Sequence, residues 1–174
     1  MSLRKIVIYP ADALKEKASD VSEIDGAVVK LAEDMAETMY AAPGIGLAAP
    51  QVGESKRIIV LDVPIDDDRT TGLIKLANPV LVESEGEVEH EEGCLSLPGL
   101  YEVVRRKAKV LVKGIDLSTE REVEIEADGL FAIALQHEID HLDGVLFIDR
   151  LSPMKRKFAL KRYRKILKEK EKEL

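Results

Sequence analysis

The sequence predicts an α+β fold, in which mostly antiparallel sheets surround a buried helix that carries an HExxH motif, with a further helix at the C-terminus. Three observations predict it. Short strand-like segments fill the middle of the chain, two of them (108–116 and 121–129) alternate apolar and polar residues, and segments with helical spacing flank them. Strands grouped between helices are typical of an α+β domain, so we expect residues 1–174 to form one domain.

The first predicted helix lies within residues 22–44. Asp25 can cap its N-terminus, and Pro43 with Gly44 marks its end. The apolar positions that recur at helical spacing are Val28, Leu31, Met35 and Met39.

The segments that follow predict loops and strands. We expect a loop or strand edge at 44–53, a short buried strand at 57–63, an exposed turn at 66–72, and two strand pieces at 73–84, broken at Asn78-Pro79. The short connection between 108–116 and 121–129 predicts an antiparallel hairpin with one wet face. Its inward positions are Val123, Ile125 and Ala127, and its outward positions are Glu122, Glu124 and Glu126.

Two helices are predicted after the hairpin. The segment 129–144 begins with six consecutive apolar residues, from Leu130 to Leu135, so we expect it to be buried nearly all round and to end at Gly144. Residues 153–174 predict a basic C-terminal helix. Its expected apolar stripe is Met154, Phe158, Tyr163, Ile166 and Leu167.

Composition excludes several classes of protein. The chain has 174 residues, of which 45% are hydrophobic, so it is long enough to bury a core. No apolar run reaches the roughly 18 residues of a membrane span. The N-terminus lacks the features of a signal peptide, and the single cysteine, Cys94, cannot form an intrachain disulfide. We therefore expect a cytoplasmic protein with no membrane or DNA partner.

Charge is distributed unevenly. Residues 153–174 hold ten Lys and Arg against three Glu, whereas residues 1–152 hold 16 basic against 30 acidic side chains. A basic segment of this kind can contact an anionic partner such as RNA, and a solvated helix face would have the same composition.

The stretch "QHEIDH" at 136–141 carries the first sign of chemistry. His137 and His141 are four residues apart, so on a helix they project from one face and can hold one cation. Glu138 is turned away by about 100° and can act as a base beside the open position.

A catalytic site of this kind needs a third protein ligand. The histidine of the extended protease motif would stand at position 147, which is Phe147, and the next downstream glutamate, Glu169, lies in the basic tail. Upstream, Cys94 in "HEEGCLSLPG" can complete a site of two histidines and one cysteine. His90 is the alternative ligand, and we expect it to be exposed among acidic residues.

Three motifs in order, "GIGLAAPQ" at 44–51, "EGCLSLPG" at 92–99 and "QHEIDH" at 136–141, resemble peptide deformylase of the bacterial type. The resemblance covers nearly the whole chain. It implies a hydrolase that removes the N-formyl group from the N-terminal formylmethionine of nascent polypeptides and releases formate. The alternatives are an HExxH metalloprotease, or a non-catalytic protein with a structural metal site and an RNA-binding tail.

The resemblance also implies roles for individual residues. The implied metal ligands are Cys94, His137 and His141, and Fe²⁺ is the usual metal, with Zn²⁺, Ni²⁺ or Co²⁺ also able to occupy the site. The implied catalytic groups are Glu138 as acid and base, with the Gln51 side chain and the Leu95 backbone N–H around the oxyanion. The implied methionine pocket consists of Ile45, Leu130, Ile133 and Ala134, with Gly44 and Gly46 beside the peptide backbone.

Three further expectations concern the surroundings of this site. Tyr101 stands where some relatives have an arginine that orients the substrate. Asp140 is expected to pair with Arg106, either as a brace for the site or as an ion pair with no role in catalysis. The basic C-terminal helix of bacterial relatives contacts the ribosome, which implies the same partner for residues 153–174.

Overall fold

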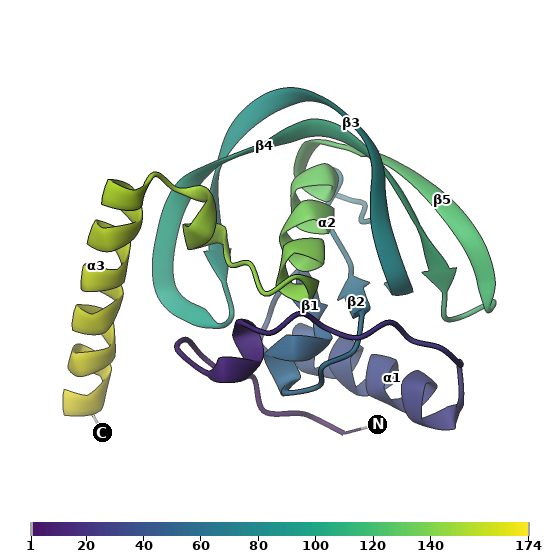
Figure 1. Cartoon of the computed structure of the whole chain (residues 1–174), viewed down its shortest axis with the longest axis horizontal. Helices are drawn as coiled ribbons and strands as arrows, with labels where there is room; N and C mark the ends of the chain where they lie inside the picture. Colours follow the sequence, from purple (N-terminus) through teal and green to yellow (C-terminus); the bar gives the residue numbers. More distant parts are fainter. Residues whose placement is uncertain (1, 174) are drawn as a thin grey trace.

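The computed structural model describes residues 2–173, and within them one antiparallel sheet in the order β1-β2-β3-β4-β5 is combined with three α-helices (Figure 1). The helices are α1 (Gly26–Ala41), α2 (Gly129–Leu142) and α3 (Pro153–Lys172). The strands are β1 (Gly46–Ala48), β2 (Ile58–Leu61), β3 (Ile74–Cys94), β4 (Leu97–Asp116) and β5 (Arg121–Asp128). Short 3₁₀ turns are η1 (Asp12–Leu14), η2 (Ala49–Val52) and η3 (Phe147–Arg150). The predicted α+β class is confirmed.

Helix α1 forms as its sequence predicts. The Asp25 side chain accepts a hydrogen bond from the Val28 N–H at 3.0 Å, which satisfies one of the N–H groups that a helix N-terminus leaves free. The four apolar positions predicted for its inner face are all buried. They pack against β1 and β2 in an apolar cluster that includes Leu47 and Ile58.

Strands β3 and β4 form one long hairpin that arches over α2 (Figure 1). The predicted break at Asn78-Pro79 is wrong, because β3 continues through it with a shift in register between Ala77 and Val80. Asn78 has a positive φ of 52°, and its side chain exchanges two hydrogen bonds with the Val21 backbone, at 2.8 and 2.9 Å. The irregularity is therefore a bulge that ties the sheet to the N-terminal segment.

Strand β4 begins at Leu97, well before the predicted start at residue 108. Its second half pairs with β5 as predicted, with Val112 opposite Ile125. The three glutamates of β5 are exposed and Ala127 is buried, so the hairpin has the expected wet face.

Helix α2 packs against the concave side of the sheet. Leu135, Ile139 and Leu142 share an apolar cluster with residues of β2, β3 and β4. The N–H of Gly144, with φ of 73°, donates to the His141 carbonyl oxygen at 3.2 Å, which ends the helix where the sequence predicts.

Helix α3 lies to one side of the arch (Figure 1). Its buried residues are Ala159, Leu160 and Tyr163, which pack against η3 and the start of β4. The predicted stripe is wrong for Met154 and Phe158, which are 70% and 57% exposed. The helix turns a face centred on Leu160 to the body, and this leaves the first apolar residues of the stripe in solvent.

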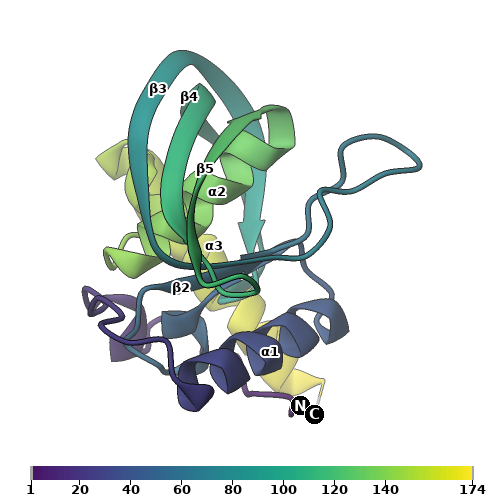
Figure 2. The same cartoon turned by 90° about the vertical axis from the view of Figure 1, so that its right-hand side faces the viewer.

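The connection between β2 and β3 extends away from the body (Figure 2). Its residues 66–70 are exposed, in agreement with the predicted turn. Across residues 2–173, no helix combines the length and apolar character that crossing a bilayer requires.

Candidate metal centre and substrate pocket

The end of β3 and the second half of α2 bring one cysteine and two histidines together. One donor atom from each of Cys94, His137 and His141 lies within 4.8 Å of the other two. The Sγ of Cys94 is 3.4 Å from Nε2 of His141, and the two imidazole rings are 5.0 Å apart between centroids. A thiolate and two imidazoles at this spacing form a donor set suited to a divalent transition metal.

Local structure explains why the three donors meet. His137 and His141 share one face of α2 because they are separated by about one helical turn. Cys94 is the last residue of β3, just before the tight turn to Leu97, so the hairpin tip carries the thiol to the helix. His90, the alternative ligand, is exposed as predicted and is not part of the donor group.

Glu92 fixes the orientation of His137. Its carboxylate lies 2.9 Å from Nδ1 of His137, which leaves Nε2 to face the other donors. Burial alone would raise the pKa of Glu92, but the Arg106 guanidinium and His137 outweigh it and lower that pKa to about 2. Burial lowers the pKa of His137, whereas the nearby Glu138, Cys94 and Glu92 raise it well above its usual range. A cation and a proton therefore compete for this ring.

A buried ion-pair network extends from Glu92. Arg106 donates to both oxygens of Glu92, from Nε at 2.7 Å and from Nη2 at 2.8 Å, and from Nη1 to Asp140 at 2.6 Å. Asp140 also accepts two hydrogen bonds from Arg150 of η3, at 2.6 and 3.1 Å. The predicted pair of Asp140 and Arg106 is confirmed, whereas Glu92 and Arg150 were not predicted.

Glu138 points its carboxylate into the same region. It is buried, and its Oε1 atom has no hydrogen-bond partner among the described residues. Gly46 lies directly against it, since a Cβ built on Gly46 would be 2.5 Å from Oε2 of Glu138. Burial raises the pKa of Glu138 to about 7, although His137 opposes that shift. A buried carboxyl group with this pKa can both accept and release a proton near neutral pH.

Gln51 lies beside Cys94 of the donor group. Its Nε2 is 3.6 Å from the Cys94 Sγ and donates to the Ser96 hydroxyl at 3.1 Å, while its Oε1 accepts from the Ala48 N–H at 3.0 Å. The carbonyl end is thus held by the backbone, and the N–H₂ end faces the donors. Ser96 was not predicted from the sequence.

The Leu95 side chain packs against Gly44. A Cβ built on Gly44 would lie 2.9 Å from Cδ1 of Leu95, so a larger residue at position 44 would require the Leu95 side chain to move. The motifs at 44–51 and 92–99 are therefore in direct contact at the site.

A pocket of about 510 Å³ opens beside these groups. Every predicted site residue except His141 lines it, and His141 lies just beneath, 1% exposed. The predicted substrate residues on its walls are Gly44, Ile45, Gly46, Leu130, Ile133 and Ala134. Tyr101 and His90 line its mouth.

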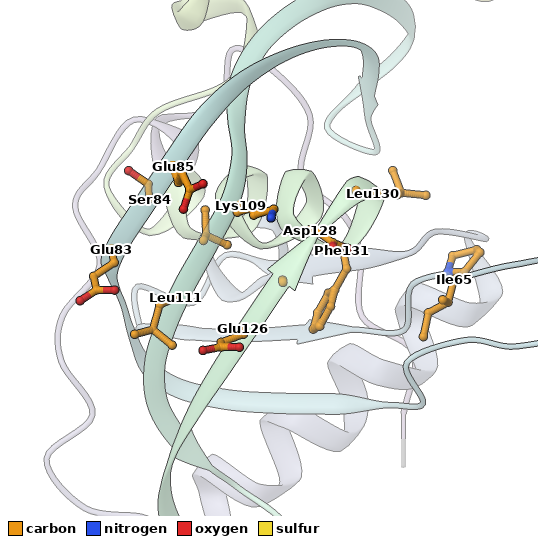
Figure 3. Close-up of a pocket in the computed structure, with 14 residues that line it drawn as sticks. Ile65, Glu83, Ser84, Glu85, Lys109, Leu111, Glu126, Asp128, Leu130 and Phe131 are labelled. Atoms are coloured by element: carbon orange, nitrogen blue, oxygen red, sulfur yellow. The ribbon is translucent and has the colours of Figure 1, made fainter.

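A second hollow of about 640 Å³ lies where the start of α2 meets β3, β4 and β5 (Figure 3). Phe131 and Leu130 form part of its wall, and most of its charged side chains are acidic. Among residues 2–173, the group that can share a cation is the Cys-His-His set, and this hollow contains none of its members.

Comparison with known proteins places this chain in a family. The family model described as polypeptide deformylase matches residues 3–157. The chain belongs to the peptide deformylase family. The peptide deformylase of Thermodesulfovibrio yellowstonii is 53% identical over 94% of this chain and 98% of its own length. That of Syntrophobacter fumaroxidans is 51% identical over 97% of this chain and 98% of its own length.

Solved structures of peptide deformylases agree. The crystal structure of the enzyme from Legionella pneumophila has a TM-score of 0.88 at 44% identity and covers 97% of this chain and 98% of its own. The Ehrlichia chaffeensis enzyme, solved in complex with actinonin, has a TM-score of 0.88 at 39% identity and covers 95% of this chain and 98% of its own. Peptide deformylases are metal-dependent hydrolases, in keeping with the donor set described above.

Proposed function

We propose that this chain removes the N-formyl group from the N-terminal formylmethionine of nascent polypeptides and releases formate, with Cys94, His137 and His141 of the hairpin tip and α2 as the ligands of one divalent metal. The observation that carries the proposal is the convergence of these donors with a buried carboxylate and a side-chain amide at one pocket. When bound, the metal would supply Lewis acidity that lowers the pKa of water at the site.

The surrounding residues supply proton transfer and charge stabilisation. Glu138 accepts a proton as the water oxygen attacks the formyl carbon, and it then donates that proton to the amine nitrogen as the C–N bond breaks. The Gln51 Nε2–H₂ and the Leu95 backbone N–H donate hydrogen bonds to the carbonyl oxygen as its negative charge develops. The products are formate and a free α-amine.

Substrate positioning follows from the free edge of β3. Within the described residues, β3 pairs with β2 only through Ile74–Ala77, so its stretch from 85 to 93 is paired on one side only, by β4. A peptide can lie along this edge, facing Gly44–Gly46, and pair with backbone groups. Its methionine side chain then enters the pocket formed by Leu130, Ile133 and Ala134. A formyl carbon carries only hydrogen, so the close contact of Gly46 with Glu138 leaves less room for an acetyl group.

The two alternatives are not favoured. A protease of the extended motif needs a histidine where Phe147 stacks on His137, with ring centroids 6.2 Å apart, and Glu169 is exposed on α3. A closed structural site has no need of a buried, unpaired Glu138 beside a pocket.

We propose Fe²⁺ as the metal in the cell. The same thiolate and imidazole donors can also accept Zn²⁺, Ni²⁺ and Co²⁺. We further propose that residues 1–174 act as one domain in the cytoplasm. The outer face of α3 would contact ribosomal RNA there, because Lys161, Arg164 and Lys165 are exposed while Leu160 and Tyr163 face the body.

The decisive experiment uses anaerobically purified protein. Metal content is measured, and formyl-Met and acetyl-Met peptides are each incubated with the Fe²⁺- or Ni²⁺-loaded enzyme. Release of formate from the first and no hydrolysis of the second is expected. Hydrolysis of neither peptide would refute the proposal.

Variants assign the proton-transfer role. Glu138→Ala should retain the metal, and its turnover number should fall by about 10²–10⁴-fold. Glu122→Ala, which removes an exposed carboxylate on β5, is the matched control and should behave as the unchanged protein. A Glu138→Ala enzyme that stays active would show that another group transfers the proton.

A further inference from the structure

The outer face of the β3–β4 hairpin carries an exposed aromatic ring at the mouth of the pocket. Tyr101 is 62% exposed, lines the pocket, and stands opposite Gly93 in the antiparallel pair. A Cβ built on Gly93 would lie 2.5 Å from Cε1 and 2.8 Å from Cδ1 of the Tyr101 ring. The ring therefore covers the backbone of Gly93, next to the free edge of β3.

Strand geometry relates this ring to the substrate. Side chains of a β-strand alternate between its two faces, and residues directly opposite in a pair project to the same face. Gly93 and Tyr101 thus share the outer face, whereas Glu92 and Arg106 lie on the inner face beside α2.

A peptide added along the β3 edge obeys the same alternation. If its methionine side chain points inward to Ile133 and Ala134, the side chain of the next residue points outward. There it meets a position where Gly93 contributes no side chain and the Tyr101 ring provides an exposed, planar, apolar surface.

We propose that Tyr101 is a specificity-determining residue of this enzyme, which selects substrates whose second residue, directly after methionine, has a planar aromatic side chain. The inference rests on the proposed deformylase function and concerns the same site. The aromatic side chain stacks on the Tyr101 ring, and such aromatic pairs contribute beyond the apolar area they bury.

The experiment measures kcat/KM for formyl-Met-Phe-Ser, formyl-Met-Leu-Ser and formyl-Met-Ala-Ser. With the unchanged enzyme, kcat/KM for the Phe peptide should exceed that for the Ala peptide by about three- to tenfold. It should also exceed kcat/KM for the Leu peptide, whose side chain offers apolar area without a planar face. The difference should lie mainly in KM, because the second residue is remote from the breaking bond.

Three variants test the assignment. Tyr101→Ala should bring the ratio of the Phe to the Ala peptide close to one while the Ala peptide is still hydrolysed, and Tyr101→Phe should keep the full ratio. Val103→Ala is the matched control, because Val103 is 52% exposed one pair further along the same face and does not line the pocket. It should leave the ratio unchanged.

If the Tyr101 ring only covers Gly93 for structural reasons, replacing it would lower the stability and leave the ratio of kcat/KM for the Phe and Ala peptides intact. If Tyr101→Ala does not fold, Tyr101→Leu preserves the apolar cover, and the ratio must still fall. A full ratio in a folded Tyr101→Ala or Tyr101→Leu enzyme would overturn the inference. Failure of the unchanged enzyme to hydrolyse any of the three peptides would instead overturn the proposed function, and this inference with it.

Discussion

Replacing Arg106 by methionine leaves two buried carboxylates without their shared cation. In the folded chain the side chains of Arg106, Glu92 and Asp140 are 3%, 4% and 10% exposed. Asp140 retains its contacts with Arg150, so most of the loss falls on Glu92. Removing one partner of a buried ion pair costs about 3–5 kcal/mol, and here the remaining Glu92 carboxylate is shielded from solvent and keeps only its contact with His137.

The neighbouring Arg105 provides the control. Its side chain is 67% exposed, and it lies 3.9 Å from Glu87 and 3.4 Å from Glu89. Exposed ion pairs of this kind contribute about 0–1 kcal/mol, so Arg105→Met should change the free energy of unfolding little. The two substitutions are identical in chemistry and adjacent in sequence, and they differ in burial.

Urea denaturation of the chelator-treated protein measures both effects, and chelator competition measures metal affinity. Arg106→Met should also weaken metal binding by about 10–100-fold, since Glu92 would no longer be held against His137. Adding Glu92→Gln should recover part of the stability, because no buried carboxylate charge then remains at that position. Equal losses from Arg106→Met and Arg105→Met, or no recovery in the double variant, would refute this account of the network.

Two further substitutions test other contacts. Gly46→Ala places a methyl group 2.5 Å from the present position of Glu138 Oε2, so the carboxylate must move. Turnover should fall at least tenfold while the metal content is retained. Unchanged turnover would contradict the proposed role of that carboxylate. The pKa of Asp34 is lowered to about 2 by the Ser2 N–H and Lys30, so its contribution to stability is present above about pH 4 and is lost as the pH falls towards 2. The difference in unfolding free energy between the unchanged chain and Asp34→Asn should therefore shrink across that range, and a constant difference would show that protonation of Asp34 is not its cause.

Sequence patterns predicted the elements that have one buried face. The cap at Asp25, the alternation around Ile125 and the glycine after α2 each reflect a local rule, and each is confirmed. The second half of β3 carries no such signal. From Glu83 to Glu91 it is exposed almost throughout, because one edge is free and the arch leaves it far from the apolar core.

The donor residues could be named from motifs, whereas their supports could not. Glu92 resembles its acidic neighbours in the sequence, and only the pairing of β3 with β4 turns it inward to meet Arg106. Arg150 lies in a 3₁₀ turn whose position depends on packing beneath α3. One signal in the sequence could have indicated that Glu92 faces the site: residues two apart in a strand project to the same face, and Glu92 is two residues before Cys94.

The free edge of β3 also bears on how copies of the chain behave at high concentration. An unpaired strand edge is a template for pairing with another molecule, and flat apolar edges promote aggregation. Here the edge carries exposed carboxylates at Glu85, Glu87, Glu89 and Glu91, so two such edges repel each other. Gly93 interrupts this row of charge next to the pocket. The edge of β3 can therefore stay accessible to a short extended peptide, while its negative charge disfavours pairing with the β3 edge of a second copy of the chain.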